Sequence, residues 1–371
     1  MQMKGIERFA KRMTMSAIAR MMGKNGRGTG ERPDWRERPY RVLFLRHDRI
    51  GDMILSTGIL RAIAAAHPTI QLDVLASRSN APVLRHAPYL RNVIVFDKHS
   101  PTSFPYTFRD LRHRSYDAVI DCMVTAPSLT TLLLMLASGA RYRIGVAGKG
   151  EGGDGGNDFA YTLPVPPRET ADHIIDKLGT LLTAFGVQPS GVDLRPTVEL
   201  TDAERQRGEE MWRGATNHGA RAWPRLLVNV SAGRAHHHWP DQRFVEVIRA
   251  ARAHVASSDV VVVSSPSDRA RAATIAAEGG ARLVEDHGIR DAMSLVAQAD
   301  VVFTPDTSIG HAADAFDRPA VVLHPRGNAA IWGPYNAEGR VVESATDSVA
   351  DITAGEAVQA LVARFASLPA R

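Results

Sequence analysis

The same alternation of structural patterns occurs twice along this chain, and it constrains the fold more than any other feature. Short apolar stretches typical of buried strands are followed by segments whose apolar residues have helical spacing. One round covers residues 40–146 and the other residues 225–324. Strands separated by helices form βαβ units and a mostly parallel sheet. We therefore predict an α/β protein with two Rossmann-like, doubly wound domains facing each other across a cleft. The predicted strands are residues 41–45, 71–77, 92–97, 117–123, 142–146, 225–231, 259–265, 282–286, 300–306 and 319–324.

The chain has 371 residues, more than one ordinary domain contains. A stretch bearing Pro and Gly, residues 186–196, is the predicted boundary between the two domains. The last helix can cross back and pack on the first domain. The predicted parts are an N-terminal extension over residues 1–39, a first domain over 40–190, a second domain over 191–350 and a C-terminal helical segment over 351–371.

The composition is that of a soluble globular protein, with 44% hydrophobic and 23% charged residues. No apolar stretch approaches the roughly 20 residues that a membrane-spanning helix needs. Cys122 is the single cysteine, which excludes an internal disulfide and suits a reducing compartment. We therefore expect a cytoplasmic protein in which Cys122 is a core thiol.

The excess positive charge lies in the first 40 residues, which contain ten Lys or Arg and four acidic residues, while the whole chain carries only +5. The high pI therefore belongs to a tail, and this argues against a nucleic-acid-binding body. Residues 1–22 have the spacing of a basic amphipathic helix, which can lie on an anionic membrane surface. A disordered extension is the alternative. Residues 23–39 resemble a flexible linker on either account.

A polar turn follows the first apolar strand and precedes a helix with the sequence Ile50-Gly51-Asp52. In an open α/β sheet such a turn lies where ligands collect, beyond the carboxyl end of a strand. Gly51 permits either close backbone approach or a positive φ. Asp52 suits the positive N-terminal end of the helix. From the turn alone, Asp52 is either a helix cap or a catalytic carboxylate.

The turn after residues 225–231 contains Gly233, Arg234 and three consecutive histidines, and Pro240 stands at the first helical turn. A glycine-bearing turn that leads into a helix attracts phosphate, and Arg234 adds charge. We interpret this turn as a seat for a diphosphate. A metal site is the weaker interpretation, because neither a Cys nor a carboxylate stands at ligand spacing beside the histidines.

A second turn, after residues 300–306, opens a helix with either Asp306 or Thr307 as its cap. The backbone amides around Thr307 and Ser308 can bind an anion, and His311 lies one turn further on the same side. After a third strand, Asp268 either caps the next helix or hydrogen-bonds a ribose.

Several common nucleotide-binding motifs are missing from the sequence. No Gly-x-Gly-x-x-Gly leads from a predicted strand directly into a predicted helix, no Walker A lysine motif occurs, and no Asp-x-Asp pair is present. Dinucleotide dehydrogenases, P-loop enzymes and metal-dependent sugar transferases that use Asp-x-Asp are disfavoured accordingly.

Four segments together resemble the ADP-heptose:lipopolysaccharide heptosyltransferase family, glycosyltransferase family 9. They are LFLRHDRIGDMILSTGILRAI, DHIIDKLGTLLTAFGV, the turn before HHHWPDQRF, and TPDTSIGHAADAFDRPAVVLHP with the Ile-Trp-Gly-Pro that follows. The likeness runs in order from about residue 41 to residue 345. It implies a GT-B fold with an N-terminal acceptor half and a C-terminal donor half. It also implies inverting transfer without a metal or cofactor, from a nucleotide-diphosphate sugar, with ADP-heptose expected, to a lipopolysaccharide-core or related lipid-linked glycan.

The resemblance implies roles for individual residues. Asp52, in the family's Gly-Asp turn beside Gly51 and Arg49 on the acceptor side, would be the general base. The family's Asp-Thr-Gly-x-x-His turn, which holds the donor sugar and diphosphate, is matched by Asp306, Thr307, Ser308 and His311. Met293 matches a residue lining the adenine pocket, and Asp268 falls where an acid meets the ribose.

This chain departs from the family pattern at two positions. Ser308 replaces a glycine of the donor turn, and His237 or His238 stands where the family often has Lys. Histidine is largely neutral near pH 7 unless a phosphate raises its pKa, so Arg234 would supply the charge. Two alternatives remain: a GT-B sugar-nucleotide epimerase, or a non-catalytic protein that binds a nucleotide or a glycan.

Overall fold

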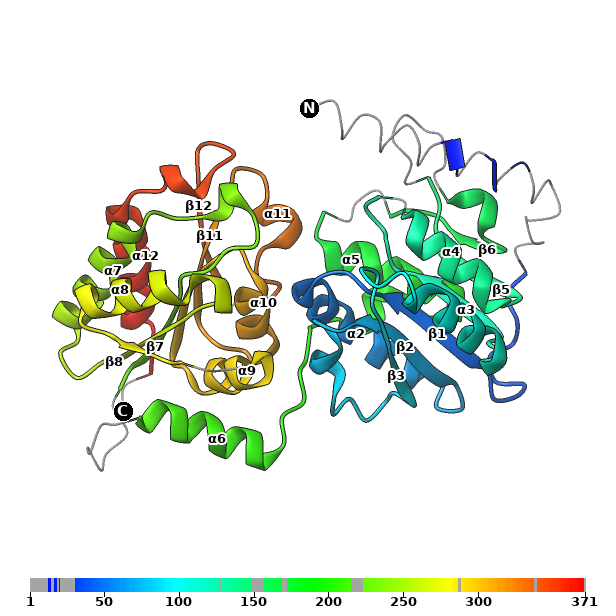
Figure 1. Cartoon of the computed structure of the whole chain (residues 1–371), viewed down its shortest axis with the longest axis horizontal. Helices are drawn as coiled ribbons and strands as arrows, with labels where there is room; N and C mark the ends of the chain where they lie inside the picture. Colours follow the sequence, from blue (N-terminus) through cyan, green and yellow to red (C-terminus); the bar gives the residue numbers. More distant parts are fainter. Residues whose placement is uncertain are drawn as a thin grey trace. The chain divides into compact units, whose positions relative to one another are not determined.

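The computed structural model describes residues 13, 14, 17, 18, 20, 31–126, 128–148, 157–168, 172–214, 223–285, 288–336 and 339–369. The chain forms two compact units, each built around a parallel sheet of six strands (Figure 1). The first unit contains residues 1–49, 56–171 and 175–194, and the second contains residues 50–55, 172–174 and 195–371. The predicted α/β class with two doubly wound sheets is confirmed.

The first sheet has the strand order β3-β2-β1-β4-β5-β6, and all its strands are parallel. Its central strand is apolar, and Val42 to Leu45 are fully buried. The order reverses between β1 and β4, so this sheet has the switch point of a doubly wound fold there. The strands are β1 (Arg41–Arg46), β2 (Gln71–Ser77), β3 (Asn92–Phe96), β4 (Ala118–Asp121), β5 (Tyr142–Val146) and β6 (Leu163–Val165).

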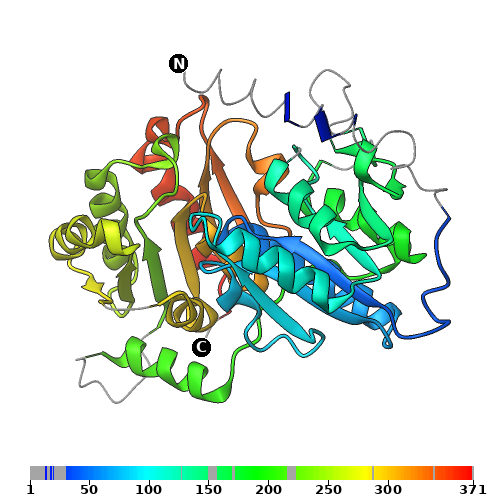
Figure 2. The same ribbon diagram turned by 45° about the vertical axis from the view of Figure 1, so that its right-hand side comes forward.

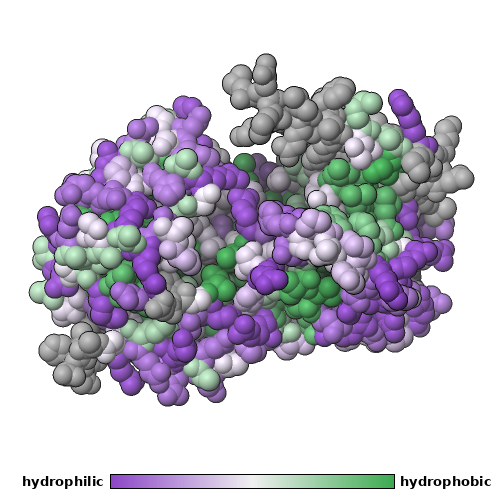
Figure 3. All heavy atoms as spheres, in the orientation of Figure 1, coloured by the Kyte–Doolittle hydropathy of each residue, from purple (hydrophilic) through white to green (hydrophobic). Residues whose placement is uncertain are grey.

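Helices lie on both sides of the first sheet (Figure 1 and Figure 2). α3 (Ser103–Arg114) and α4 (Leu129–Ser138) pack together over one face, where Leu111 and Leu132 share a core with Leu43 of β1. Ser128 caps α4 by accepting a hydrogen bond from the Thr131 amide. Hydrophobic side chains gather on the surface over α4 (Figure 3). The other helices of this half are α2 (Ile50–Ala66), α5 (Ile174–Gly179) and the 3-10 helices Ala81–Leu84, Asp158–Ala160, Thr180–Phe185 and Pro189–Gly191.

The second sheet repeats this topology with the parallel order β12-β11-β10-β7-β8-β9. Its order reverses between β7 and β10. The pattern of apolar residues did not reveal β6 and β12, because β6 has three residues and both are edge strands that need no continuous apolar run. The strands are β7 (Arg225–Asn229), β8 (Asp259–Val263), β9 (Arg282–Leu283), β10 (Val301–Pro305), β11 (Ala320–His324) and β12 (Gly339–Glu343).

The helices of the second unit form two packed groups. α7 packs against α8 and α12, while α9 packs against α6 and α10. Capping boxes begin α6 at Thr201 and α12 at Thr353, where the side chain of each threonine accepts from the amide of a glutamate three residues later. The helices are α6 (Asp202–Arg213), α7 (Asp241–His254), α8 (Arg269–Gly279), α9 (Ile289–Gln298), α10 (Ser308–Ala315), α11 (Ala329–Trp332) and α12 (Ala354–Ala366).

The last helix packs within the second unit. Leu361 and Phe365 of α12 are buried in the same core as Phe244 of α7 and Phe303 of β10. The sequence had left open that this helix packs on the first domain, and these contacts replace that interpretation. The physical reason is the apolar face of α12, which fits between α7 and β11.

The predicted linker is wrong in its second half. Trp35 is only 2% exposed, and its indole N–H donates a 2.9 Å hydrogen bond to the carbonyl of Ala184. Its ring stacks on Phe185 with 4.7 Å between ring centroids. Burial of a large aromatic side chain therefore makes residues 31–39 part of the first unit. Most of the predicted amphipathic helix over residues 1–22 lies outside the described residues, of which no helix is long and apolar enough to cross a membrane.

Candidate active site

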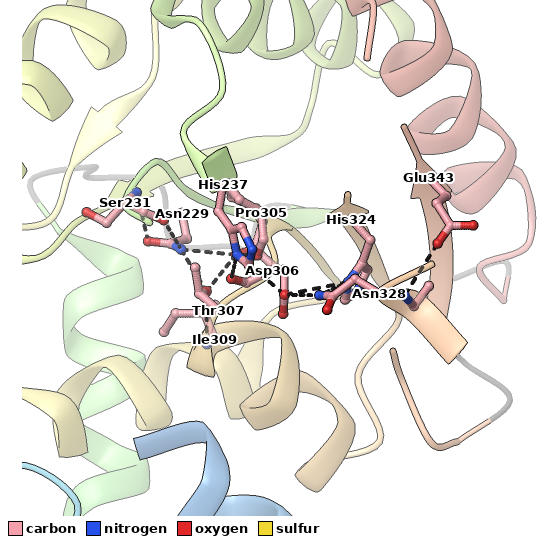
Figure 4. A network of polar contacts seen from close by, with 12 residues as sticks. Asn229, Ser231, His237, Pro305, Asp306, Thr307, Ile309, His324, Asn328 and Glu343 are labelled. Carbon is pink, nitrogen blue, oxygen red and sulfur yellow. Dashed lines mark hydrogen bonds and ion pairs between the residues drawn. The ribbon is translucent and has the colours of Figure 1, made fainter. Parts of the chain in front are cut away.

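A polar network occupies the switch point of the second sheet, beyond the carboxyl ends of β7 and β10 (Figure 4). In open α/β sheets this is the position at which ligands bind. Asn229 ends β7 and Pro305 ends β10, so Asp306 and Thr307 enter the network directly from the sheet. Two turns that the sequence singled out separately, those of His237 and Asp306, therefore meet.

The Asn229 side chain joins the two strands. Its Nδ2 donates to the carbonyl of Ser231 at 3.2 Å, to Oγ1 of Thr304 at 3.0 Å and to Oγ1 of Thr307 at 3.1 Å. Asn229 is 3% exposed and Thr304 is fully buried. A buried amide bonded in this way fixes the position of the turn that follows β10.

Thr307 caps α10. Its Oγ1 accepts a 3.3 Å hydrogen bond from the amide of Ile309. The cap therefore falls to Thr307 and leaves the Asp306 carboxylate to make other contacts. The N-terminus of α10, where Ser308 is the first residue, carries the positive end of the helix dipole and suits an anion such as phosphate.

Three side chains surround Oδ2 of Asp306. Nδ2 of Asn328 donates to it at 2.5 Å, Nδ1 of His237 lies 3.4 Å away and Nδ1 of His324 lies 3.7 Å away. His237 Nδ1 also lies 3.2 Å from the carbonyl oxygen of Asp306. Figure 4 shows these side chains converging on the carboxylate. Among the described residues, no three His, Cys, Asp or Glu side chains form a group that could hold a metal ion.

The histidines of this region are held in their neutral form. Burial lowers the pKa of His324 to about 4, and repulsion between His324 and His237 when both are protonated lowers it further. Burial also lowers the pKa of His237, against the raising effect of Asp306. Burial lowers the pKa of His311 to about 4 although Asp306 and Asp52 favour its protonation.

A second chain of hydrogen bonds extends from the same strand ends to Asp268. Oγ of Ser231 accepts from the amide of Ser265 at 2.8 Å, and Oγ of Ser265 donates to Oδ2 of Asp268 at 2.9 Å. The side chain of Asp268 makes no capping bond to α8. Of the two roles that the sequence left open for Asp268, the structure thus disfavours the helix cap.

The glycine-bearing turn lies beside the Asp306 network. Gly233 and Arg234 are exposed, whereas His237 is 5% exposed in the 3-10 helix Ala235–His237. Pro240 is the residue that precedes α7 and not its first helical residue. A hollow of about 490 Å³ adjoins the network. It is lined by His236, His237, Pro325, Arg326, Gly327, Asn328 and Asp347.

Met293 does not reach this network. It lies in α9 and is fully buried, so it offers no exposed surface to an adenine ring. Conversely, the sequence analysis missed Asn229, His324 and Asn328. Single asparagines and a histidine at a strand end carry no motif, and only the fold shows that they meet Asp306.

The polar turn at the end of β1 is held by Asn80, which the sequence analysis also missed. Asn80 is fully buried, and its Nδ2 donates to the carbonyls of Arg46 at 3.1 Å, Asp48 at 3.4 Å and Arg49 at 3.4 Å. Its Oδ1 accepts from the amide of Ser77. One amide therefore fixes the turn from which α2 starts.

Gly51 and Asp52 lie in the first turn of α2, and both residues belong to the second compact unit. Gly51 is helical, and a Cβ added to it would lie 2.6 Å from Cδ2 of His311. The sequence allowed either a positive φ or close backbone approach at Gly51, and the structure shows the close approach, to the side chain of His311. Asp52 is 5% exposed, and the α2 cap position is Arg49.

The fold and site define a class of protein. Two doubly wound domains, with a carboxylate and a helix N-terminus at one switch point, have the arrangement of a GT-B nucleotide-sugar enzyme. The family model for glycosyltransferase family 9 (heptosyltransferase) matches residues 106–361. The chain belongs to this family.

Curated relatives agree with this assignment. The chain is 21% identical over 316 residues to the lipopolysaccharide core heptosyltransferase OpsX of Haemophilus influenzae, which covers 84% of this chain and 86% of the relative. It is 20% identical over 323 residues to lipopolysaccharide heptosyltransferase 2 of Escherichia coli, covering 82% of this chain and 88% of the relative.

Solved structures have the same fold. The glycosyltransferase family 9 protein from Veillonella parvula matches with a TM-score of 0.76 at 17% identity and covers 90% of this chain and 99% of that one. The ADP-heptose lps heptosyltransferase II of Escherichia coli matches with a TM-score of 0.68 at 19% identity and covers 88% and 98%. The GT-B fold is therefore established for this chain.

Proposed function

We propose that this protein transfers heptose from ADP-heptose to a lipopolysaccharide-core or related lipid-linked glycan, with inversion at the anomeric carbon. The names of the curated relatives support heptose transfer to lipopolysaccharide, and the name of the solved Escherichia coli heptosyltransferase II supports ADP-heptose as the donor. The contact between His237 and Asp306 is the observation that best supports a donor site in the second unit. It joins two turns that the family resemblance assigns to donor binding.

In this proposal the donor diphosphate binds at the start of α10. The amides of Thr307 and Ser308, with the exposed cation of Arg234, stabilise the charge that develops on the departing diphosphate. Asp306 accepts hydrogen bonds from hydroxyls of the donor sugar. Asp268 lies on the continuous chain of hydrogen bonds from Ser231 and takes the ribose.

Asp52 is the proposed general base. Inverting transfer needs one carboxylate to take the proton of the acceptor hydroxyl as that oxygen attacks the anomeric carbon. Support comes from Gly51, whose backbone packs against His311 of the donor turn, so that the neighbouring carboxylate belongs to the same compact unit as Asp306.

A hollow in the first unit is the proposed binding place for an anionic group of the acceptor. Its volume is about 540 Å³, and three arginines, Arg78, Arg85 and Arg91, are among its lining residues, which include no carboxylate. Asp73 neutralises Arg91, at 2.6 Å, while Arg78 and Arg85 are exposed. This charge suits a phosphorylated glycolipid. Residues 1–24 are a second proposed contact, with the anionic membrane surface itself.

The decisive experiment measures ADP release from ADP-heptose with and without a heptose-acceptor glycolipid. We expect release only when the acceptor is present, and formation of an inverted glycosidic bond. Donor turnover without any acceptor would instead indicate an epimerase or a hydrolase. A thermal-shift panel of ADP-, UDP-, GDP- and dTDP-sugars tests which nucleotide the donor carries, because a bound donor raises the unfolding temperature of the protein.

A further inference from the structure

We propose that Asn328 and His324 are positioning residues for Asp306: Asn328 holds Oδ2, and His324 orients the Asn328 amide, so that Oδ1 of the same carboxylate accepts a hydrogen bond from a hydroxyl of the donor sugar. This inference rests on the proposed function, since it requires a donor that carries a sugar. Asn328 lies outside the segments that carry the family resemblance, and the resemblance assigns no role to His324, which lies inside one of them.

The two carboxylate oxygens of Asp306 have different surroundings. Oδ2 receives the Asn328 amide at 2.5 Å and lies within 4 Å of two imidazole nitrogens. In the part of the chain that the structure describes, no side chain or amide donates a hydrogen bond to Oδ1. The Asp306 side chain is 11% exposed. One oxygen is therefore anchored by the protein, and the other is left for a ligand.

A second feature is the orientation of the Asn328 amide. Its Nδ2 carries two hydrogens and contacts two acceptors, Oδ2 of Asp306 and Nδ1 of His324 at 3.4 Å. A flipped amide would bring its own oxygen against the carboxylate, which is repulsive. When the His324 proton is on Nε2, its Nδ1 is also an acceptor and favours the same orientation of the Asn328 amide.

A third feature is the rigidity of the support. His324 is the last residue of β11 and is 1% exposed, between β10 and β12 in the sheet. Four residues later, the backbone N–H of Asn328 donates a 3.2 Å hydrogen bond to the carbonyl of Pro325. This bond closes a turn in which Gly327 has φ +70°. The glycine permits this left-handed turn, which brings Asn328 back over the strand end.

A structural cost accompanies this arrangement. Nε2 of His324 is buried and has no hydrogen-bond partner among the described residues. A buried donor without a partner destabilises the fold. A phenylalanine at this position would remove the unpaired donor and also the acceptor that orients Asn328. Stability and donor binding should therefore respond in opposite directions, which a purely structural role for His324 does not predict.

The test compares ADP-heptose with ADP by isothermal titration calorimetry on the full chain. Asn328→Ala should weaken binding of ADP-heptose about tenfold or more, since it removes one charge-assisted hydrogen bond from the sugar-binding carboxylate. Binding of ADP, which has no sugar, should change by less than about twofold. Gln242→Ala, which removes an exposed amide from α7, is the matched control and should change neither affinity.

A double-mutant cycle separates positioning from general disruption. In the Asp306→Ala background, Asn328→Ala should cause no further loss of ADP-heptose affinity, because the carboxylate that it positions is gone. His324→Phe should weaken ADP-heptose binding selectively while its unfolding temperature stays equal or rises. Equal losses for ADP and ADP-heptose, additive effects in the cycle, or unchanged donor affinity in Asn328→Ala would each overturn the inference.

Failure of the proposed function would look different. If the unmodified protein binds neither ADP nor ADP-heptose but binds another nucleotide sugar, the proposed donor is wrong. The same comparison between that sugar nucleotide and its nucleoside diphosphate then tests Asn328.

Discussion

The carboxylate of Asp306 lies 3.4 Å from Nδ1 of His237, although 69 residues separate them in the chain. This contact brings the turn after β7 to the turn after β10. It also places beside the carboxylate an imidazole whose pKa is lowered by burial, close to the position where the resemblance implies a permanently charged lysine in the family. The consequence is a pH dependence that a lysine enzyme would lack.

The first prediction is that acid strengthens ADP binding through His237. Burial lowers the pKa of His237, so its imidazole gains a proton only as the pH falls below its ordinary range. The neighbouring charges are Asp306, which favours protonation, and His236 and Arg234, which oppose it. A bound diphosphate favours the protonated form and should raise this pKa. The dissociation constant of ADP, measured from pH 8 to pH 5.5, should therefore fall more steeply for the unmodified protein than for His237→Gln.

His237→Lys provides the control for that prediction. A lysine stays charged over the whole range, so its ADP affinity should lose the contribution of His237 titration. Parallel pH profiles for the unmodified protein and His237→Gln would show that His237 does not take up a proton when ADP binds.

The second prediction concerns Asp52. Asp52→Asn should lower kcat by a factor of about 10² to 10⁴, the usual contribution of a general base. The affinity for ADP-heptose should stay within a few-fold of the original, because the proposed diphosphate and sugar contacts lie at α10 and Asp306. Steady-state kinetics with saturating acceptor, together with calorimetry, separate the two effects. Full activity of Asp52→Asn would show that Asp52 is not the general base.

The third prediction is that the protein loses stability as the pH falls from about 6.5 toward 4, the interval between the unfolded and folded histidine pKa values. Burial lowers the pKa of His47, His311 and His324 to about 4. In the unfolded chain these histidines bind protons near pH 6.5, while in the folded protein they stay neutral. Their stabilisation is thus complete above the unfolded pKa and declines below it. Urea unfolding at pH 7.5, 6.0 and 5.0 should show this decline.

A substitution tests which histidine causes the decline. His324→Phe removes one group that stays neutral in the fold until the pH falls to about 4. The stability of this variant should therefore depend less on pH, by at most about 3 kcal/mol between the unfolded and folded pKa values. An unchanged pH slope would mean that His324 does not take up a proton on unfolding.

The fourth prediction concerns the turn at the end of β1. Asn80→Ala leaves the carbonyls of Arg46, Asp48 and Arg49 without the amide that joins them. We expect a loss of about 1–3 kcal/mol in the free energy of unfolding, the cost of leaving buried polar groups unsatisfied. Because this turn starts the helix that carries Asp52, kcat should also fall, while ADP affinity stays unchanged. A stable variant with normal kcat would refute the positioning role of Asn80.

Local patterns predicted the parts of the fold and site that are local in sequence. The apolar runs revealed the central strands, and the turn at Asp306 and Thr307 was recognisable from residues that stand side by side. Trp35 looked like part of a linker because its partner, Phe185, is far away in the sequence. Asn328 and His324 were missed for the same reason, since their chemistry depends on strand neighbours. Met293 shows the converse, because a matching position did not tell how deeply α9 would bury it.

The last prediction separates two sources of membrane binding. Deletion of residues 1–30 removes the basic extension and keeps Trp35, whose burial makes residues 31–39 part of the fold. Sedimentation with vesicles containing anionic phospholipid should weaken in this variant. The difference should be largest at low salt, because salt screens the attraction between the basic extension and the anionic surface, over about 10 Å at 0.1 M salt.

Arg78→Ser with Arg85→Ser should instead weaken binding of the phosphorylated glycolipid acceptor and raise its KM. Vesicle sedimentation that is the same with and without residues 1–30 would leave the extension without a membrane role, and an unchanged acceptor KM in the arginine variant would exclude the hollow beside β3 as an acceptor contact.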